Sequence, residues 1–502
     1  MPKKLPIFYS ALLLTGVNLL LRFVGTSFQV YISSRLGAAG VGLLQLVLSV
    51  GSLALVAGIA GIRTAAMYLT AEELGRGKSN HVTWVLSGCF LYSILFSGTV
   101  SLLLYTFAPR IAQYWIGDTR TVDALRLLAA FLPCTCLCGV MTGYFTAANR
   151  IGTLAAVEVA EQFCSMAITM GALSLWAGTD VGRACLCVVL GSAGGALFTL
   201  LCLIVLRLQE RPHLGEPIFV GRRLMDTALP LGTADVLKSG INTVENLMVP
   251  KRLGLCILVE NPLAAFGTVS GMVFPVIMFP ACILFGLAEL LIPELARCAA
   301  AKSKVRIQYL VKRSLRLAML YGTFFGGAIF LLAEELCLWL YGNREAVPFL
   351  QLYSLLIPML YCDAITDAMT KGLGQQKACV RYNILTSALD VVFLYMLLPR
   401  YGMMGYFASF FATHLLNFLL SLRRLLRITG QHIPLFIPML AMTAAAASIG
   451  GAAGFSSPML RIGCYAVLLG SLLYLMKIIR REDLAWLKGL LSIRKNTLGE
   501  VL

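Results

Sequence analysis

Residues 8–34, FYSALLLTGVNLLLRFVGTSFQVYISS, form an apolar run that is long enough to cross a lipid bilayer. A membrane-spanning helix needs about 20 apolar residues, because it rises 1.5 Å per residue through a hydrocarbon core of about 30 Å. Lys3 and Lys4 precede the run, as they would in a signal peptide, but no small-residue cleavage site follows it. We therefore interpret the run as an uncleaved first span.

Similar apolar runs recur along the whole chain of 502 residues, in which 59% of the residues are hydrophobic and 13% are charged. A soluble protein carries roughly 25% charged residues, so the charge here is too sparse to cover a water-facing surface. The runs are continuous and lack the alternation of a transmembrane barrel. We predict an all-α polytopic membrane protein with about 14 transmembrane helices, at residues 8–34, 40–69, 82–108, 124–147, 153–176, 184–206, 226–249, 264–292, 310–333, 348–369, 381–398, 402–421, 433–453 and 460–479.

The distribution of positive charge predicts the orientation of these spans. An even number of spans puts both termini on one side, and the loops and flanks of that side hold 27 of the 41 lysines and arginines. Cytoplasmic loops carry an excess of these residues, so we predict that both termini are cytoplasmic and that the chain lies in the cytoplasmic membrane. The net charge of +17 is explained by orientation and by anionic lipid, and we expect no nucleic-acid partner.

Two matched segments predict an internal duplication. The triplet 35–37 (RLG) recurs at 252–254, and the segment 131–150 resembles 356–375 at a similar offset. Six spans per unit in the same orientation would give parallel repeats related by a pseudo-two-fold axis along the membrane normal. We predict two six-helix lobes at 1–207 and 224–428, a cytoplasmic linker at 208–223, two extra helices in 429–480 and a cytoplasmic tail at 481–502.

Polar residues repeat at helical spacing inside the first predicted span. Asn18 and Arg22 belong to a stripe that continues through Thr26 to Ser33 in steps of three and four residues, which places them on one helical face. A charge at mid-membrane costs at least about 2.5–3.5 kcal/mol, so Arg22 should face protein or water. Arg63, in the second span, is a further cavity candidate, with snorkelling to the interface as its alternative. A structural ion pair is the alternative role for Arg22.

The seventh predicted span carries a second stripe of Asp235, Lys238, Asn242 and Glu245. Its steps of three, four and three again keep one face, and Asp235 and Lys238 are close enough in sequence to form a local ion pair. An acid, a base and a second acid on one intramembrane face are typical of a water-filled cavity. We predict Lys238 and Asn242 as substrate-binding residues beside Arg22, Arg63 and Asn18.

Carboxylates inside the spans are the candidate sites for a coupling cation. Their charge can be neutralised by a bound ion or by protonation. Structural pairing with nearby basic residues is the competing role for each of them. The candidates are Asp235, Glu245, Asp363, Asp367 and Asp390.

No catalytic signature is present in the sequence. It contains no P-loop motif, no HExxH and no G-x-S-x-G, and only four histidines. We therefore expect neither ATP hydrolysis, nor a bound metal, nor a resident cofactor beyond a coupling monovalent cation or the membrane potential.

The opening segment 19–50, LLLRFVGTSFQVYISSRLGAAGVGLLQLVLSV, resembles the start of the multidrug/oligosaccharidyl-lipid/polysaccharide (MOP) exporter superfamily. Within it, the sequence is most similar to the branch of stage V sporulation protein B and the polysaccharide exporters. The resemblance extends over the whole chain, with two six-helix lobes and two extra C-terminal spans. It is carried by pattern and length more than by an invariant motif.

This resemblance implies a flippase that moves a lipid-linked saccharide, such as the peptidoglycan precursor lipid II, across the membrane by alternating access. Membrane lipids and cell-wall synthases are the partners that it implies. The related lipid II flippases keep basic residues on spans 1, 2 and 8. Arg22 and Arg63 fall on the first two, whereas span 8 (264–292) has no lysine or arginine. Lys238 on span 7 is the candidate substitute.

Three other functions remain open from the sequence. A cation-coupled multidrug exporter of the same superfamily would usually carry an acid on the first span, where this chain has Arg22. A membrane enzyme that acts on lipid-linked sugars would need a catalytic acid or histidine in a long outer loop, and the longest predicted one offers only Asp118. A scaffold would gain nothing from two intramembrane charge stripes.

Overall fold

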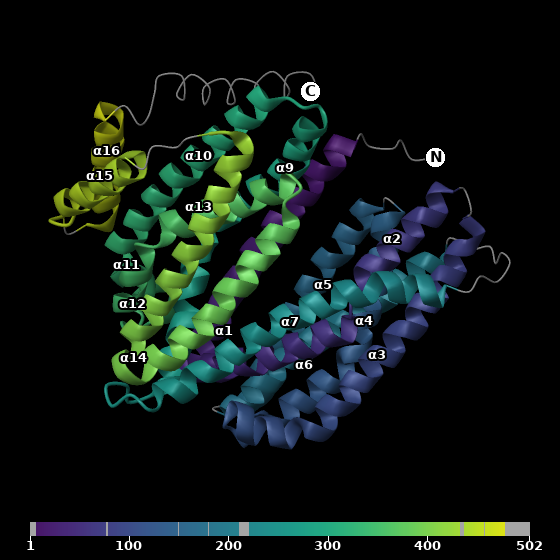
Figure 1. The fold of residues 1–502 in the computed structure, drawn as a ribbon. Helices are drawn as coiled ribbons and strands as arrows, with labels where there is room; N and C mark the ends of the chain where they lie inside the picture. Colours follow the sequence, from purple (N-terminus) through teal and green to yellow (C-terminus); the bar gives the residue numbers. More distant parts are fainter. Residues whose placement is uncertain are drawn as a thin grey trace, which may run out of the picture. The chain divides into compact units, whose positions relative to one another are not determined.

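The computed structural model describes residues 7–76, 79–148, 150–178, 180–209, 220–431, 436–455 and 457–476. Every element in these ranges is a helix, which confirms the predicted all-α class (Figure 1). Most of the predicted linker at 208–223, and all of the tail at 481–502, lie outside the described residues.

The chain packs as two compact units, and the first comprises residues 1–286 and 380–413. Its α-helices are α1 (Ile7–Ile59), α2 (Ile62–Gly75), α3 (Val82–Arg110), α4 (Val122–Ala147), α5 (Ile151–Ala172), α6 (Val181–Gln209), α7 (Gly221–Leu253) and α8 (Pro262–Gly267), of which α8 is short. Short helical turns join them, at η1 (Ser79–His81), η2 (Ile111–Ile116), η3 (Thr119–Thr121), η4 (Leu173–Ala177) and η5 (Thr268–Val273). The start of α9 (Phe274–Ala300) and the middle of α14 (Gln376–Thr429) complete the unit.

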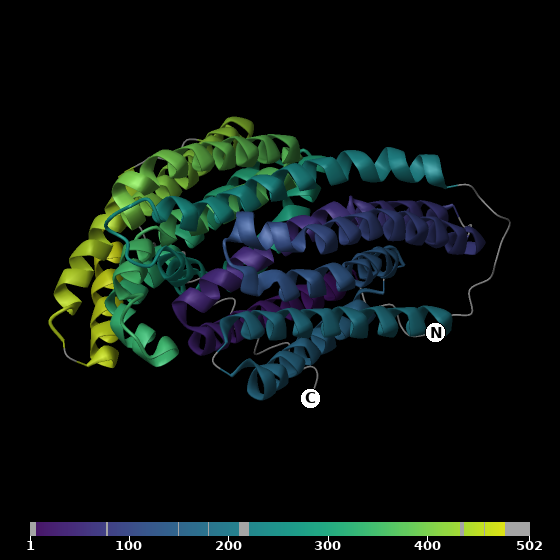
Figure 2. The same cartoon turned by 90° about the horizontal axis from the view of Figure 1, so that it is seen from below.

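The second unit comprises residues 287–379 and 414–502. Its helices are α10 (Lys304–Leu331), α11 (Ala333–Tyr341), α12 (Val347–Ser354), α13 (Ile357–Gly372), α15 (Phe436–Ala452) and α16 (Pro458–Leu475), together with the ends of α9 and α14. α15 and α16 lie side by side, as Figure 2 also shows. They fall on the last two predicted spans. The predicted division into two six-helix lobes concerns topology and stays a prediction.

Eight helical segments of the described chain are long and apolar enough to cross a membrane, or nine if the bent pair of α12 and α13 counts as one span. α1 and α14 each merge two helices across a kink, at Gly37 and Gly402. α14 therefore carries two of the predicted spans, and α1 carries the first span and most of the second. α5 and α7 are not among the eight segments, and both carry charged residues at several positions. The predicted total of about 14 stays a prediction.

Two predicted spans are broken where the sequence pattern suggested continuous helices. Span 40–69 is interrupted between α1 and α2, where Ala60 (φ 41°) and Gly61 (φ 75°) take left-handed backbone conformations. Span 348–369 bends by 53° between α12 and α13. Apolar periodicity continues through both breaks, so hydropathy alone does not reveal them. The hydroxyl of Tyr92 donates to the carbonyl oxygen of Ala60 at 3.2 Å, which satisfies a backbone group that the break frees.

α7 is held against α2 by close backbone contact and by ion pairs. A Cβ atom added to Gly61 would lie 2.3 Å from the carbonyl oxygen of Ala228, so only glycine allows this approach. At the start of α7, the Arg223 guanidinium donates to Glu72 at 2.6 Å and to Glu73 at 3.0 Å. Glu73 is 2% exposed, and this buried carboxylate is therefore charge-compensated.

α1 and α8 pack equally closely through Gly42 and Gly267. A Cβ atom at Gly267 would lie 1.9 Å from the carbonyl oxygen of Ala38. We expect Gly267→Ala to push the two helices apart and to lower the free energy of unfolding by about 1–3 kcal/mol. The measurement is thermal unfolding in detergent, with Gly98→Ala as the control, because Gly98 has open space around it. Equal midpoints for the two variants would contradict the packing account.

Candidate functional site

Arg22 lies on the first half of α1 with its side chain exposed. Its guanidinium stands over the ring of Phe285 in α9, 4.8 Å from the ring centroid. Within the described ranges, Arg22 makes no ion pair, so the structural-pairing alternative is not supported there. Predicted span 8 thus places an aromatic ring, rather than a cation, beside Arg22.

The rest of the α1 stripe divides between packing and the site. The hydroxyl of Ser33 is buried and donates to the carbonyl oxygen of Gly271 at 2.6 Å, so this end of the stripe joins α1 to η5. Thr26 donates to the carbonyl oxygen of Arg22 within its own helix. The side chain of Asn18 lies outside the described residues.

Arg63 occupies the first turn of α2, directly after the break at Ala60 and Gly61. Its backbone is held tightly, because a Cβ atom on Gly143 of α4 would lie 2.5 Å from the Arg63 carbonyl oxygen. Its side chain is exposed and interacts electrostatically with Glu158 of α5. Left-handed backbone at a non-glycine residue is costly and concentrates at functional sites. The break therefore determines the position of the Arg63 side chain at the start of α2.

α7 carries Asp235, Lys238 and Asn242 with their side chains exposed. None of the three makes a hydrogen bond or ion pair with another side chain of the described chain. The local ion pair between Asp235 and Lys238 that their spacing allowed is therefore not formed. The i,i+3 spacing brings two side chains to one face but does not force their charged ends together.

Glu245, one turn further along α7, meets the first half of α14. Its carboxyl group lies within hydrogen-bonding reach of the carboxyl group of Asp390. Asp390 is 4% exposed and also accepts from the hydroxyls of Ser409, at 2.5 Å, and Thr413, at 3.2 Å. Tyr406 is buried close to both acids. We call Glu245, Asp390, Ser409 and Thr413 the carboxyl cluster.

The kink in α14 builds this cluster. Gly402 has a φ of 53° and a ψ of −131°, a conformation that favours glycine. The helix therefore folds back on itself there, and Ser409 and Thr413 approach Asp390 across the kink. Two neighbouring carboxyl groups repel each other when both are ionised, and a proton on one of them removes this repulsion. The cluster is thus chemically suited to hold one proton.

The two remaining acidic candidates belong to the second unit. Asp363 in α13 accepts from the amide of Asn417, at 3.3 Å and 3.2 Å to its two oxygens. Asp367 lies 2.6 Å from the ammonium group of Lys371, one helical turn away. Asp367 is therefore engaged in an ion pair, whereas Asp363 has only a neutral donor.

The structure thus separates two kinds of group in the first unit. Arg22 and Lys238 are exposed cations without an ion-pair partner in the described chain, and Arg63 is an exposed cation near a carboxylate. Exposure of such charges to hydrocarbon is costly, so the surface that carries them must be wet. The carboxyl cluster is instead buried and hydrogen-bonded. The first arrangement suits an anionic ligand, and the second suits a proton or a cation.

Several of these residues could not be predicted as part of the site from the sequence. Phe285, Ser409 and Thr413 are ordinary membrane-helix residues, and nothing in their own spacing marks them. Glu158 is visible as an intramembrane acid, but its proximity to Arg63 depends on the packing of α2 and α5. The one sequence signal for Ser409 and Thr413 is their separation by four residues on one helical face.

The hydroxyl donors to Asp390 generate a stability prediction. We expect Thr413→Val to lower the free energy of unfolding by about 1–3 kcal/mol, because it preserves shape but leaves a buried acceptor with one donor fewer. Thr106→Val is the matched control, since the Thr106 hydroxyl is exposed and donates only within its own helix. Thermal unfolding in detergent measures both. A Thr413→Val midpoint no lower than that of the control would contradict the assigned hydrogen bond.

The chain is similar in sequence to one curated protein and in fold to several solved structures. No family model matches the chain. The chain is 23% identical to stage V sporulation protein B of Bacillus subtilis (strain 168) in an alignment of 410 residues that covers 78% of each protein. This similarity agrees with the resemblance that the sequence suggested.

Solved structures share the same architecture. The lipid II flippase MurJ in an inward closed conformation matches with a TM-score of 0.68 at 11% identity, covering 93% of this chain and 100% of the other. An inward-facing multidrug resistance MATE family transporter of the MOP superfamily matches with a TM-score of 0.67 at 12% identity, covering 86% and 99%. A MOP superfamily transporter from Pyrococcus furiosus, described as having a binding pocket of reverse polarity, matches with a TM-score of 0.59 at 14% identity, covering 84% and 96%.

Proposed function

We propose that this chain, a multi-pass membrane protein with the fold of the MOP superfamily transporters, is a flippase for a lipid-linked saccharide with an anionic diphosphate. The observation that carries the proposal is the exposed Arg22 on the first half of α1, which makes no ion pair with any residue that the structure describes. The similarity to stage V sporulation protein B and the shared fold with MurJ support it. The protein then acts as a transporter rather than as an enzyme, in the cytoplasmic membrane and with both termini in the cytoplasm.

The charges of the first unit suit such a substrate. A diphosphate needs cations in a wet cavity, where charge-assisted hydrogen bonds to its oxygens are strong. Arginine presents a planar fork of donors that matches phosphate, and lysine adds a compact point charge. We assign diphosphate binding to Arg22 and Lys238, with Arg63 held near Glu158 as a third cation. Asn18 and Asn242 complete the proposed sugar-phosphate site, and the apolar tail stays in lipid.

The substrate class is broader than lipid II in this proposal. In the lipid II flippases that the sequence resembles, span 8 supplies a basic residue, whereas here it supplies the ring of Phe285 beside Arg22. A ring can stack on the guanidinium and orient it, but it adds no charge. We therefore propose a polyprenyl-diphosphate sugar, with lipid II as its first member to test. Cell-wall synthases are the proposed downstream partners.

We assign energy coupling to the carboxyl cluster. Glu245 and Asp390 lie close enough to share one proton, and α7 carries both Glu245 and the proposed phosphate ligand Lys238. Release of that proton would leave two neighbouring negative charges, which repel each other and destabilise this packing of α7 against α14. Protonation thereby biases the alternating conformations. Asp235 and Asp363 are secondary coupling candidates, and Asp367 is the weakest, because it is paired with Lys371.

The proposed anion site predicts the effect of Arg22→Ala on transport. In liposomes that contain a fluorescent lipid II, we expect the wild type to move the label between leaflets and the variant to do so at least about tenfold more slowly, since a hydrogen bond to a charged group contributes about 1.5–3 kcal/mol. A zwitterionic lipid should stay in place. Arg183→Ala is the matched control, because Arg183 is 70% exposed in a side-chain pair with Asp180 outside this site.

Each outcome of that assay is decisive. Loss of transfer in Arg22→Ala but not in Arg183→Ala supports the anion site. Absence of transfer by folded wild type, with any imposed ion gradient, contradicts flipping of lipid II. Export of cationic drugs in the same vesicles would favour the multidrug alternative, which the shared MATE fold and the buried acids also fit.

The coupling assignment predicts the phenotype of Asp390→Asn. The amide still bonds the hydroxyls of Ser409 and Thr413 but cannot release a proton. We expect the variant to fold and to transport at a rate that no longer responds to an imposed pH gradient. Asp180→Asn, outside the cluster, should keep the wild-type response. A pH-gradient response that persists in Asp390→Asn would place coupling elsewhere.

A further inference from the structure

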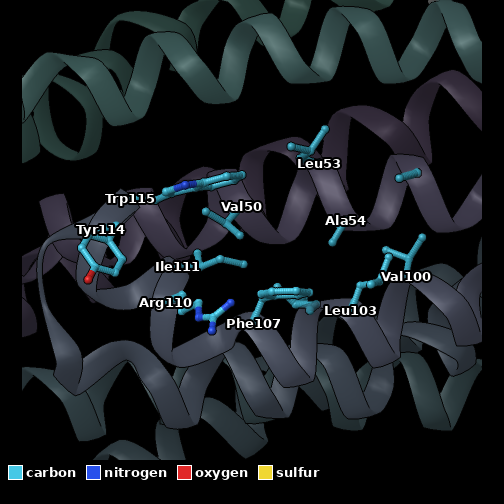
Figure 3. Close-up of a pocket in the computed structure, with 12 residues that line it drawn as sticks. Val50, Leu53, Ala54, Val100, Leu103, Phe107, Arg110, Ile111, Tyr114 and Trp115 are labelled. Atoms are coloured by element: carbon cyan, nitrogen blue, oxygen red, sulfur yellow. The ribbon is translucent and has the colours of Figure 1, made fainter.

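A groove of about 740 Å³ lies between the second half of α1 and the end of α3, and neither Arg22 nor any residue of the carboxyl cluster lines it (Figure 3). Its volume is within the range of about 300–1,000 Å³ that ligand pockets occupy. Its lining is apolar apart from one end, where Arg110, Tyr114 and Trp115 gather. α1 contributes Val50 and Ala54, and α3 contributes Leu103 and Phe107, with Val100 at the far end.

The depth of the groove matches one leaflet of a bilayer. Val100 and Arg110 are ten residues apart on α3, which corresponds to about 15 Å at 1.5 Å per residue. This is half of a hydrocarbon core of about 30 Å. The groove therefore extends from the membrane surface to about the midplane. Tyr114 and Trp115 mark its shallow end, since aromatic side chains of this kind prefer the headgroup level.

The shallow end is positively charged. Arg110 is exposed and lies over the ring of Phe107, 5.6 Å from the centroid, and it makes no ion pair within the described part of the chain. Lys251, at the end of α7, donates to the backbone carbonyl of Tyr114. Two cations thus stand at headgroup depth above an apolar groove, which is complementary to an anionic headgroup with an apolar chain.

We propose that this groove binds one acyl chain of an anionic phospholipid, with the lipid phosphate on Arg110 and Lys251. An acyl chain that fills one leaflet fits the depth of the groove, whereas a polyprenyl tail exceeds one leaflet. The site belongs to the leaflet at the end of α3, where the predicted topology places the extracytoplasmic side. The bound lipid joins α1, α3 and the end of α7 at that surface.

Photolabelling tests the site directly. The protein is reconstituted in phosphatidylcholine vesicles with a small fraction of phosphatidylglycerol that carries a photoreactive acyl chain, and adducts are located by mass spectrometry. We expect adducts at groove residues of α1 and α3, and competition by unlabelled phosphatidylglycerol. Leu103→Trp should fill the groove and remove most of the labelling. Leu102→Trp is the matched control, because Leu102 is exposed at the same depth of α3 but does not line the groove.

The headgroup assignment is tested with Arg110→Gln. A cation near the membrane surface accounts for a preference of roughly fivefold for an anionic lipid, so the ratio of phosphatidylglycerol to phosphatidylcholine labelling should fall by about that factor.

Adducts spread evenly over α3 in the wild type, or equal labelling in the Leu103 and Leu102 variants, would contradict binding of an acyl chain in the groove. A ratio unchanged in Arg110→Gln would overturn the phosphate site. Stronger competition by a polyprenyl phosphate would assign the groove to a substrate tail instead. Lipid II transfer can persist or fail independently of all these results.

Discussion

The cost of placing charge in hydrocarbon is the constraint on which the rest of this structure depends. Each ionisable group inside a span must be paired, protonated or exposed to water. The described chain uses all three solutions. Asp367 is paired with Lys371, Glu245 lies beside the carboxyl group of Asp390, and Arg22 remains exposed. The first solution compensates a charge within the fold. In our proposal, the second holds a proton and the third faces a cavity that an anionic substrate enters.

Backbone geometry decides which of these solutions each group adopts. The kink at Gly402 brings two hydroxyls to Asp390, and the break at Ala60 and Gly61 presents the Arg63 side chain at the start of a new helix. Close approaches at Gly61 and Gly267 fix α7 and α8 against the N-terminal helices. Because α7 carries Lys238 and Glu245 two turns apart, a change of charge in the carboxyl cluster acts on the same helix that binds substrate in our proposal. Coupling then needs no long-range pathway.

The sequence predicted those features that depend on local pattern. Apolar length identified the all-α membrane class, and spacing of three and four identified the stripes that contain Arg22 and Lys238. Pairings that depend on packing could not be predicted, because Glu245 and Asp390 are far apart in the chain and meet only in the folded unit. The break after Ile59 was also missed, since apolar residues continue through it. In one case the spacing was misleading, because the ion pair that it allowed between Asp235 and Lys238 is not formed in the structure.

The central claim is that the charged face of α7 lines a water-filled cavity that binds a diphosphate. The most direct test is labelling of Asn242→Cys in proteoliposomes by a membrane-impermeant thiol reagent, followed at that single site by mass spectrometry. Leu102→Cys on the apolar face of α3 is the control. The account predicts that Cys at 242 reacts, that Cys at 102 does not, and that a polyprenyl-diphosphate sugar protects the first. An unreactive site at 242, or a reactive one that no lipid diphosphate protects, would contradict it.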